Sequence, residues 1–183
     1  LLDVNADAKI NALTIGRGLG NVSTNTAFGF ETLFSNWSYN NTAVGFNVLR
    51  ANTSGSTNTG LGTSVLQTNT TGSGNSAFGN ESMLNNLNGN FNVALGARTL
   101  YTNATGSENV ASGIWSMYNN TSGSNNSAYG AWSMQANTTG SGNTAVGNYA
   151  LRSNTTGYSN VAVGNSALYS NTALTHIVAI GDS

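Results

Sequence analysis

The sequence contains no cysteine and no proline, and only 6% of its 183 residues are charged. Without cysteine, disulfides and thiolate metal sites are excluded. Without proline, every residue can donate an N–H to a strand ladder. The formal net charge of −1 gives no electrostatic attraction to nucleic acid or to an anionic membrane. No apolar run reaches the roughly 20 residues of a membrane-spanning helix. We therefore expect no nucleic-acid partner and no membrane insertion by this segment.

What the sequence does contain is a repeat with the consensus Asn-Thr-Ala-Val-Gly-x-x-Ala-Leu-x-x-Asn-Thr-Thr-Gly-Ser-x, whose positions we number as slots one to seventeen. The Asn of slot one recurs at steps of 17, at Asn41, Asn58, Asn75, Asn92, Asn109, Asn126, Asn143 and Asn160. A first copy opens at Asn25, one residue short of this step, and a tenth begins at Ile177 and breaks off. A fixed period of this kind predicts a solenoid, in which each repeat buries its apolar face by stacking on the next.

The periodicity also predicts the fold class and the organisation of the chain. No segment shows the 3.6-residue pattern of an amphipathic helix. We expect an all-β protein, a parallel β-solenoid or β-roll of 17-residue coils. Each coil is predicted to carry one strand around slots one to four, a second around slots seven to ten, and turns at glycine. Residues 1–24 form a lead-in with a first irregular coil, and residues 25–183 form about nine full coils and a truncated tenth. Because the sequence breaks off within a repeat, we expect the natural protein to continue.

Two apolar columns are predicted to fill the core of the coils. Slot four holds Val, Leu, Ile, Phe or Tyr in all copies except at Ser112. Slot nine holds Leu or Met in every complete copy: Leu33, Leu49, Leu66, Met83, Leu100, Met117, Met134, Leu151 and Leu168.

A third column, at slot three, predicts an interface between identical chains. It consists of Ala27, Ala43, Ala77, Ala94, Ala111, Ala128, Ala145, Ala162 and Ala179, with Gly60 as the exception. Neighbouring residues of a strand point to opposite faces, so alanine points outward if slot four points inward. A strand that is apolar on both faces is buried on both. In the alternative arrangement alanine faces into a narrow coil and the larger residue faces the partner, which also buries both faces.

Asparagine recurs at slots one and twelve in nearly every copy. Stacked at the strand spacing of about 4.8 Å, such side chains can form hydrogen-bonded ladders, or each can stabilise its own turn. Several Asn-x-Ser/Thr sequons, including Asn36, Asn69, Asn103 and Asn137, coincide with slot twelve. We interpret them as turn residues and not as glycosylation sites.

Residues for catalysis or metal binding are scarce. His176 is the one histidine, and the carboxylates form no pair placed by the repeat for acid–base chemistry. Asp3-Val-Asn-Ala-Asp7 resembles the start of a calcium loop but has Ala8 at the sixth position and Thr14 at the twelfth, where glycine and an acid are required. We expect no catalytic residues, no cofactor and no metal.

Slot seven varies from copy to copy and carries three aromatic residues in consecutive copies. They are Trp115, Trp132 and Tyr149. Exposed aromatic patches mark binding surfaces, so these residues are the candidates for contact with a glycan or receptor. Alternatively, the rings cover the core or fill a groove between chains.

The repeat resembles known fibrous proteins. The stretches 143–147 (Asn-Thr-Ala-Val-Gly) and 160–164 (Asn-Val-Ala-Val-Gly) resemble the motif in head domains of trimeric autotransporter adhesins. With Ala150-Leu151 and the turn at 154–157, the full repeat is similar to repeats in phage tail fibres and in large bacterial surface proteins. The resemblance implies left-handed parallel β-rolls, assembled as a homotrimer with three chains side by side.

These features together predict a function. We expect a structural, non-enzymatic shaft segment of a trimeric virion tail fibre or spike, a rigid spacer that supports attachment to a host. The partners would be further copies of the chain and a host surface glycan or receptor, and the location the virion surface. The alternative is a bacterial cell-surface adhesin or extracellular filament. An ice-binding solenoid is less consistent, because slot two mixes Thr, Ser and Val where a regular Thr column is required.

Overall fold

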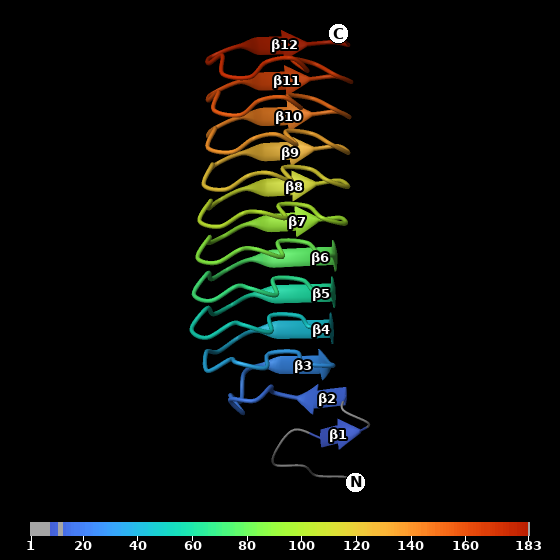
Figure 1. The fold of residues 1–183 in the computed structure, drawn as a ribbon, viewed down its shortest axis with the longest axis vertical. Helices are drawn as coiled ribbons and strands as arrows, with labels where there is room; N and C mark the ends of the chain where they lie inside the picture. The colour runs from blue at the N-terminus through green and yellow to red at the C-terminus, as the bar shows by residue number, and fades with distance from the viewer. Residues whose placement is uncertain (1–7, 11–12, 183) are drawn as a thin grey trace.

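The computed structural model describes residues 8–10 and 13–182. It shows an all-β parallel solenoid of about nine coils spaced by about 17 residues, with no helix in the described ranges (Figure 1). The coils stack into a rod whose N- and C-terminal ends lie at opposite tips. The predicted solenoid of 17-residue coils is thereby confirmed.

Over the described residues, twelve strands form one sheet, and their order in the sheet is their order in the chain. The strands are β1 (Ala8–Ile10), β2 (Leu13–Gly16), β3 (Thr26–Gly29), β4 (Thr42–Phe46), β5 (Thr59–Thr63), β6 (Ser76–Asn80), β7 (Val93–Leu95), β8 (Val110–Ser112), β9 (Ser127–Tyr129), β10 (Thr144–Val146), β11 (Val161–Val163) and β12 (Val178–Ile180). β1 pairs antiparallel with β2, and β2 antiparallel with β3. From β3 onward all pairs are parallel, and each slot pairs with the same slot of the next coil, as Ala145 does with Ala162.

Each coil has one strand, so the prediction of a second strand at slots seven to ten is wrong. Residues at slots seven and nine have φ between 48° and 62°, whereas a strand requires strongly negative φ. Left-handed residues reverse the direction of successive peptide groups. Accordingly, the N–H of Ser64 donates to Phe46 O of the preceding coil, and the N–H of Leu66 donates to Ser82 O of the following coil. This side of the coil is therefore bonded to both neighbours without forming a sheet.

The core consists of the slot-nine column, and the slot-three column packs with it inside the coil. From Leu33 to Leu151 the slot-nine side chains are fully buried, and Leu168 in the last complete coil is partly buried. The prediction that the alanine column faces a partner chain is wrong for Ala27, Ala43, Ala77, Ala94, Ala111, Ala128, Ala145 and Ala162, which are buried within their own chain, and Ala179 in β12 is partly exposed.

The narrowness of the coil explains why this column is alanine. Slot three faces slot eight across the interior, so the side chains of these two slots must together fit the fixed interior width of the coil. At Gly60 an added Cβ would lie 2.5 Å from Val48 Cγ1 and 3.4 Å from Val65 Cγ1. Gly60 thus occupies the one slot-three position that lies between two slot-eight valines, Val48 and Val65, where a close-packed interior cannot accept the added Cβ.

Two ladders of buried asparagine amides run along the interior. At slot twelve, Asn120 Nδ2 donates to Asn103 Oδ1 of the preceding coil at 2.7 Å and to Gly123 O of its own turn at 2.9 Å. At slot one, Asn109 Nδ2 donates in the same way to Asn92 Oδ1 at 3.1 Å and to Gly123 O at 2.9 Å. Each amide therefore links its coil to the preceding one and also stabilises its own turn. Buried side chains of this kind are inaccessible to glycosylation in the folded chain.

Candidate functional site

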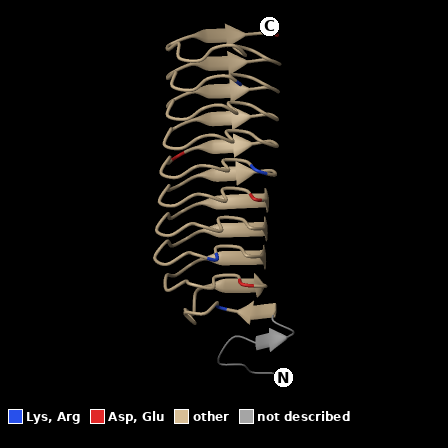
Figure 2. Ribbon diagram, viewed as in Figure 1, with Lys and Arg blue, Asp and Glu red and all other residues tan. Residues whose placement is uncertain are grey.

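Over strands β3–β12 the outer surface of the sheet carries no charge; its slot-four side chains are apolar except at Ser112, and its slot-two side chains are Thr, Ser or Val. Slots two and four of β3–β12 point outward, because slot three points inward. We call this surface the sheet face. Its most exposed side chains are those of slot four, among them Phe28, Leu61, Leu95, Tyr129, Val146 and Ile180. The prediction that slot four fills the core is therefore wrong. Figure 2 shows how few charged residues the whole solenoid carries.

A second surface carries a continuous stack of aromatic rings contributed by slots seven and ten. We call it the aromatic stack; it comprises Tyr101, Tyr118, Trp115, Trp132, Tyr149 and Tyr169. From Tyr101 to Tyr149, the centroids of successive rings lie 4.5 to 6.2 Å apart and their planes differ by 7° to 24°. The spacing follows from the rise of one coil, which brings equivalent side chains about 4.8 Å apart.

The stacking determines which ring faces of the predicted glycan-contact residues, Trp115, Trp132 and Tyr149, can contact a sugar. Trp115 lies against Tyr118 and Trp132, and Trp132 lies between Trp115 and Tyr149. The flat faces of both tryptophans are thus largely occupied by other rings, and both residues are partly buried. A sugar packs on a ring face, so the two tryptophans are poorly disposed for such contact, whereas Tyr149 at the end of the regular stack is 37% exposed. The alternative, in which the rings stabilise the coil surface, suits Trp115 and Trp132 better.

Arginines pack on the rings at this surface, and two of them are ion-paired. Arg98 lies over the Trp115 ring at 5.4 Å, and its Nε donates to Glu81 Oε2 at 2.6 Å. The hydrogen bond and the charge of Glu81 raise the pKa of Arg98 above its ordinary value. Arg50 pairs with Glu31 at 2.5 Å in the same manner.

Arg152 differs from both. Its guanidinium lies 5.8 Å from the ring centroid of Tyr149 and 5.4 Å from that of Tyr169, and its Nη1 donates to Tyr169 Oη at 2.6 Å. No carboxylate pairs with it among the described residues. Sequence reasoning missed this residue, although a signal existed. Glu81 and Arg98 stand one 17-residue step apart, whereas the residues one step from Arg152 are Gln135 and Tyr169.

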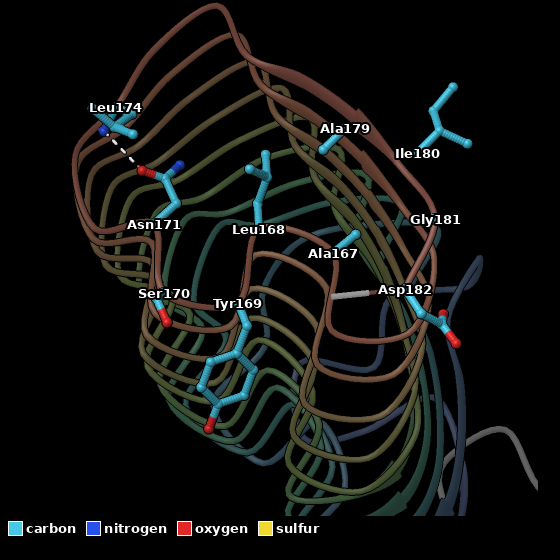
Figure 3. A pocket seen from close by; sticks show the side chains of 10 residues that line it. All are labelled: Ala167, Leu168, Tyr169, Ser170, Asn171, Leu174, Ala179, Ile180, Gly181 and Asp182. Carbon is cyan, nitrogen blue, oxygen red and sulfur yellow. Dashed lines mark hydrogen bonds between the residues drawn. The ribbon is translucent and has the colours of Figure 1, made fainter.

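A cavity of about 540 Å³ opens at the C-terminal tip of the solenoid (Figure 3). Its lining includes Ala167, Leu168 and Asn171 of the ninth coil and residues 179–182 of the strand above. In the coils below, the equivalent space is filled by the side chains of slots eight, nine and twelve. The cavity is therefore an unfilled part of the solenoid core, and we assign no ligand to it.

No catalytic or metal-binding cluster is present in the described part of the chain. No three His, Asp or Glu side chains gather there as metal ligands. His176 is exposed, and its ring contacts Tyr158 edge-on at 5.1 Å. The calcium-loop resemblance at Asp3–Asp7 lies outside the described residues. Within the described ranges no helix could cross a membrane.

No protein family, curated protein or solved structure matches this chain. The features that bear on function are therefore the sheet face, the aromatic stack and the asparagine ladders.

Proposed function

We propose that this chain is a structural, non-enzymatic shaft segment of a homotrimeric fibre, a virion tail fibre or spike that supports host attachment. The observation that carries the proposal is the sheet face, which is uncharged from β3 to β12 and exposes a column of slot-four side chains that is apolar except at Ser112. A monomer rarely exposes one continuous apolar surface of this extent.

The dimensions of the sheet face suit contact with further copies. The strands of this face have three to five residues, which at about 3.3 Å each give a width of about 10–16 Å, and ten strands at about 4.8 Å give a length of about 48 Å. The area is thus about 500–800 Å², and its upper end is what one partner contributes to a stable interface of standard size. Identical chains share the same coil rise, so their slot-four side chains can interdigitate in register over this length. The resemblance to autotransporter heads supports three chains around one axis and left-handed coils.

The interior suits a rigid spacer. Neighbouring coils are bonded through the sheet and the turn backbone, and the two asparagine ladders add side-chain bonds as far as Asn154 and Asn160. Such stacking leaves no hinge along the rod, and the described coils span on the order of 45 Å.

The experiment compares two leucines of equal exposure on different surfaces. Leu95 lies on the sheet face and Leu87 on the turn surface, and each is 42% exposed. Light scattering should give the parent chain a mass of three times 18.7 kDa. Leu95→Lys, combined with Leu61→Lys, should lower the mass to that of a monomer, because buried lysines without partners oppose association. Leu87→Lys should leave it unchanged. A parent chain that is monomeric at all concentrations would refute the proposal.

A further inference from the structure

We propose that Arg152, Tyr149 and Tyr169 form a binding site for an acidic saccharide, with the guanidinium binding the carboxylate and the tyrosine rings packing on the sugar. The site lies on the aromatic stack and not on the sheet face. It therefore goes beyond the shaft function and depends on a single chain.

The first observation is the unpaired charge. Arg50 and Arg98 occupy similar positions over aromatic rings, and both are neutralised by glutamates. Over the described ranges Arg152 has no such partner, and its Nε is buried without a hydrogen-bond acceptor. The buried Nε is out of reach of a ligand, so a carboxylate would bind end-on to Nη1 and Nη2, whose coplanar N–H groups can form two parallel hydrogen bonds.

The second observation is that the aromatic stack opens at this place. Below Tyr149 successive ring planes differ by at most 24°, whereas the planes of Tyr149 and Tyr169 differ by 57° at a centroid distance of 6.2 Å. The two rings are therefore not in face-to-face contact. Tyr149 is 37% and Tyr169 36% exposed. Tyr169 is also one of the residues that line the end cavity (Figure 3).

The combination defines the ligand class. The C–H groups of a pyranose carry partial positive charge and pack on the negative face of an aromatic ring. The guanidinium of Arg152, which lies near both rings, can bind one negative charge of the ligand. Tyr169 Oη accepts a hydrogen bond from Arg152 Nη1 and can also form a hydrogen bond with a sugar hydroxyl. A uronic acid unit offers all three complementary features. A neutral sugar lacks the charge, and a free carboxylate or phosphate lacks the ring.

The nearest acidic residue of the next coil does not neutralise the site. Asp182 lies in the strand-end turn above, where its Oδ1 accepts the Asn165 N–H at 2.9 Å. It is not ion-paired with Arg152.

The experiment is calorimetric titration of the full chain with trigalacturonic acid and, in parallel, with galactotriose, acetate and inorganic phosphate. The trigalacturonate should bind at least about tenfold more tightly than each of the other three. Arg152→Gln keeps the size and polarity of the side chain but removes the charge, and should weaken the binding about tenfold or more. Tyr169→Phe, which removes only the hydroxyl, should weaken it less.

Arg98→Gln is the matched control, because Arg98 also packs on an aromatic ring but is paired with Glu81. It should leave the affinity unchanged. Near-ultraviolet circular dichroism of each variant reports whether the aromatic stack is intact. Equal weakening by the Arg98 and Arg152 variants, equal affinity for acidic and neutral trisaccharides, or no binding of trigalacturonate would overturn the assignment. Binding of phosphate as tight as trigalacturonate would also overturn it, since the rings would then contribute nothing.

Discussion

At the scale of single residues, the glycine of slot five, which lies within strands β3–β6 and directly after strands β7–β12, has a conformation that other residues avoid. Gly113 has φ of 133°, and an added Cβ would lie 2.5 Å from both C and O of Gly130 in the next coil. The clash is with backbone, which cannot rotate away as a side chain could. The column is therefore glycine for two reasons, the dihedral angle and the contact between coils.

We predict that Gly113→Ala lowers the free energy of unfolding by about 3 kcal/mol or more, because backbone strain and overpacking add. Urea denaturation followed by circular dichroism measures the change.

Gly142→Ala is the control for conformation alone. Gly142 has φ of 67°, and its added Cβ would come no closer than 3.7 Å to any neighbour. The same slot holds Asn125 and Ser159 with φ of 59° and 56°. Its replacement should cost only about 1–2 kcal/mol. If both substitutions cost the same, close approach between coils does not explain the slot-five column.

At the scale of elements, the sequence indicated the strand and its repeat but not which face of the strand is inside. Alternation separates slot three from slot four, and both columns are apolar. The choice depends on the width of the coil, which is set by slot eight on the opposite side. Gly60 beside Val48 shows that the sizes of the slot-three and slot-eight side chains depend on each other. This dependence can be recognised in the sequence only once the two slots are known to face each other.

The turn at slots seven to nine could not be predicted for a related reason. Leucine and methionine avoid the left-handed region as isolated residues. In this fold every complete coil places one of them there, with φ of 48° to 52° at slot nine. Burial of the side chain and hydrogen bonds to both neighbouring coils offset the strain, and these are long-range effects that the local sequence does not encode.

The candidate aromatic residues were predictable as a column, since the 17-residue step places Trp115, Trp132 and Tyr149 above one another. The orientation of their rings was not. Whether stacked side chains present faces or edges depends on rotamers selected by the neighbouring rings, including Tyr118 from slot ten.

We predict that the aromatic stack contributes to stability through ring-to-ring contact. In a double-mutant cycle of Trp115→Ala and Trp132→Ala, the coupling energy should be about 0.5–1.5 kcal/mol, the range for stacked aromatic pairs. Urea denaturation of the four proteins supplies the energies.

The control cycle pairs Trp115→Ala with Tyr158→Ala. Tyr158 is exposed on the turn surface and has its ring contact with His176. The two substitutions should be additive within about 0.5 kcal/mol. A coupling near zero between Trp115 and Trp132 would mean that the rings are independent surface groups.

At the scale of the whole molecule, the solenoid is a one-dimensional stack in which each coil is bonded to its two neighbours. The asparagine ladders run in one direction along this stack, because their Nδ2 atoms donate to the Oδ1 atoms of the preceding coil, and both ladders are interrupted near the last described strand. Ile177 occupies slot one of the tenth coil, where its backbone N–H donates to Asn160 Oδ1 at 3.0 Å but its side chain has no amide to continue the ladder. In the ninth coil Leu174 replaces the slot-fifteen glycine and its N–H donates to Asn171 Oδ1, while Asn171 Nδ2 and Asn154 Oδ1 have no hydrogen-bond partner, so the slot-twelve ladder is broken between these two residues. Both interruptions fall at one corner of the coil, so the regular interior ends there by a change of sequence.

The same interior predicts how the molecule responds to pH. Its buried polar side chains, over the described residues, are all Asn, Ser or Thr, which do not titrate. The described carboxylates and His176 lie at least partly exposed. Stability depends on pH only where folded and unfolded states bind different numbers of protons. The raised pKa of Arg98 contributes stability that is lost only as pH rises past the ordinary arginine range, far above the pH of most measurements.

We therefore predict that the free energy of unfolding changes by less than about 1 kcal/mol between pH 5 and pH 9. Urea denaturation at constant ionic strength across this range measures it, and Asn120→Asp provides the comparison. Asn120 is fully buried in the slot-twelve ladder, so an aspartate there must be desolvated when charged and its pKa should be raised. The variant should lose stability as pH rises through this range, because the unfolded chain releases its proton at lower pH. A steep pH dependence in the parent chain would contradict an interior held together by neutral amides.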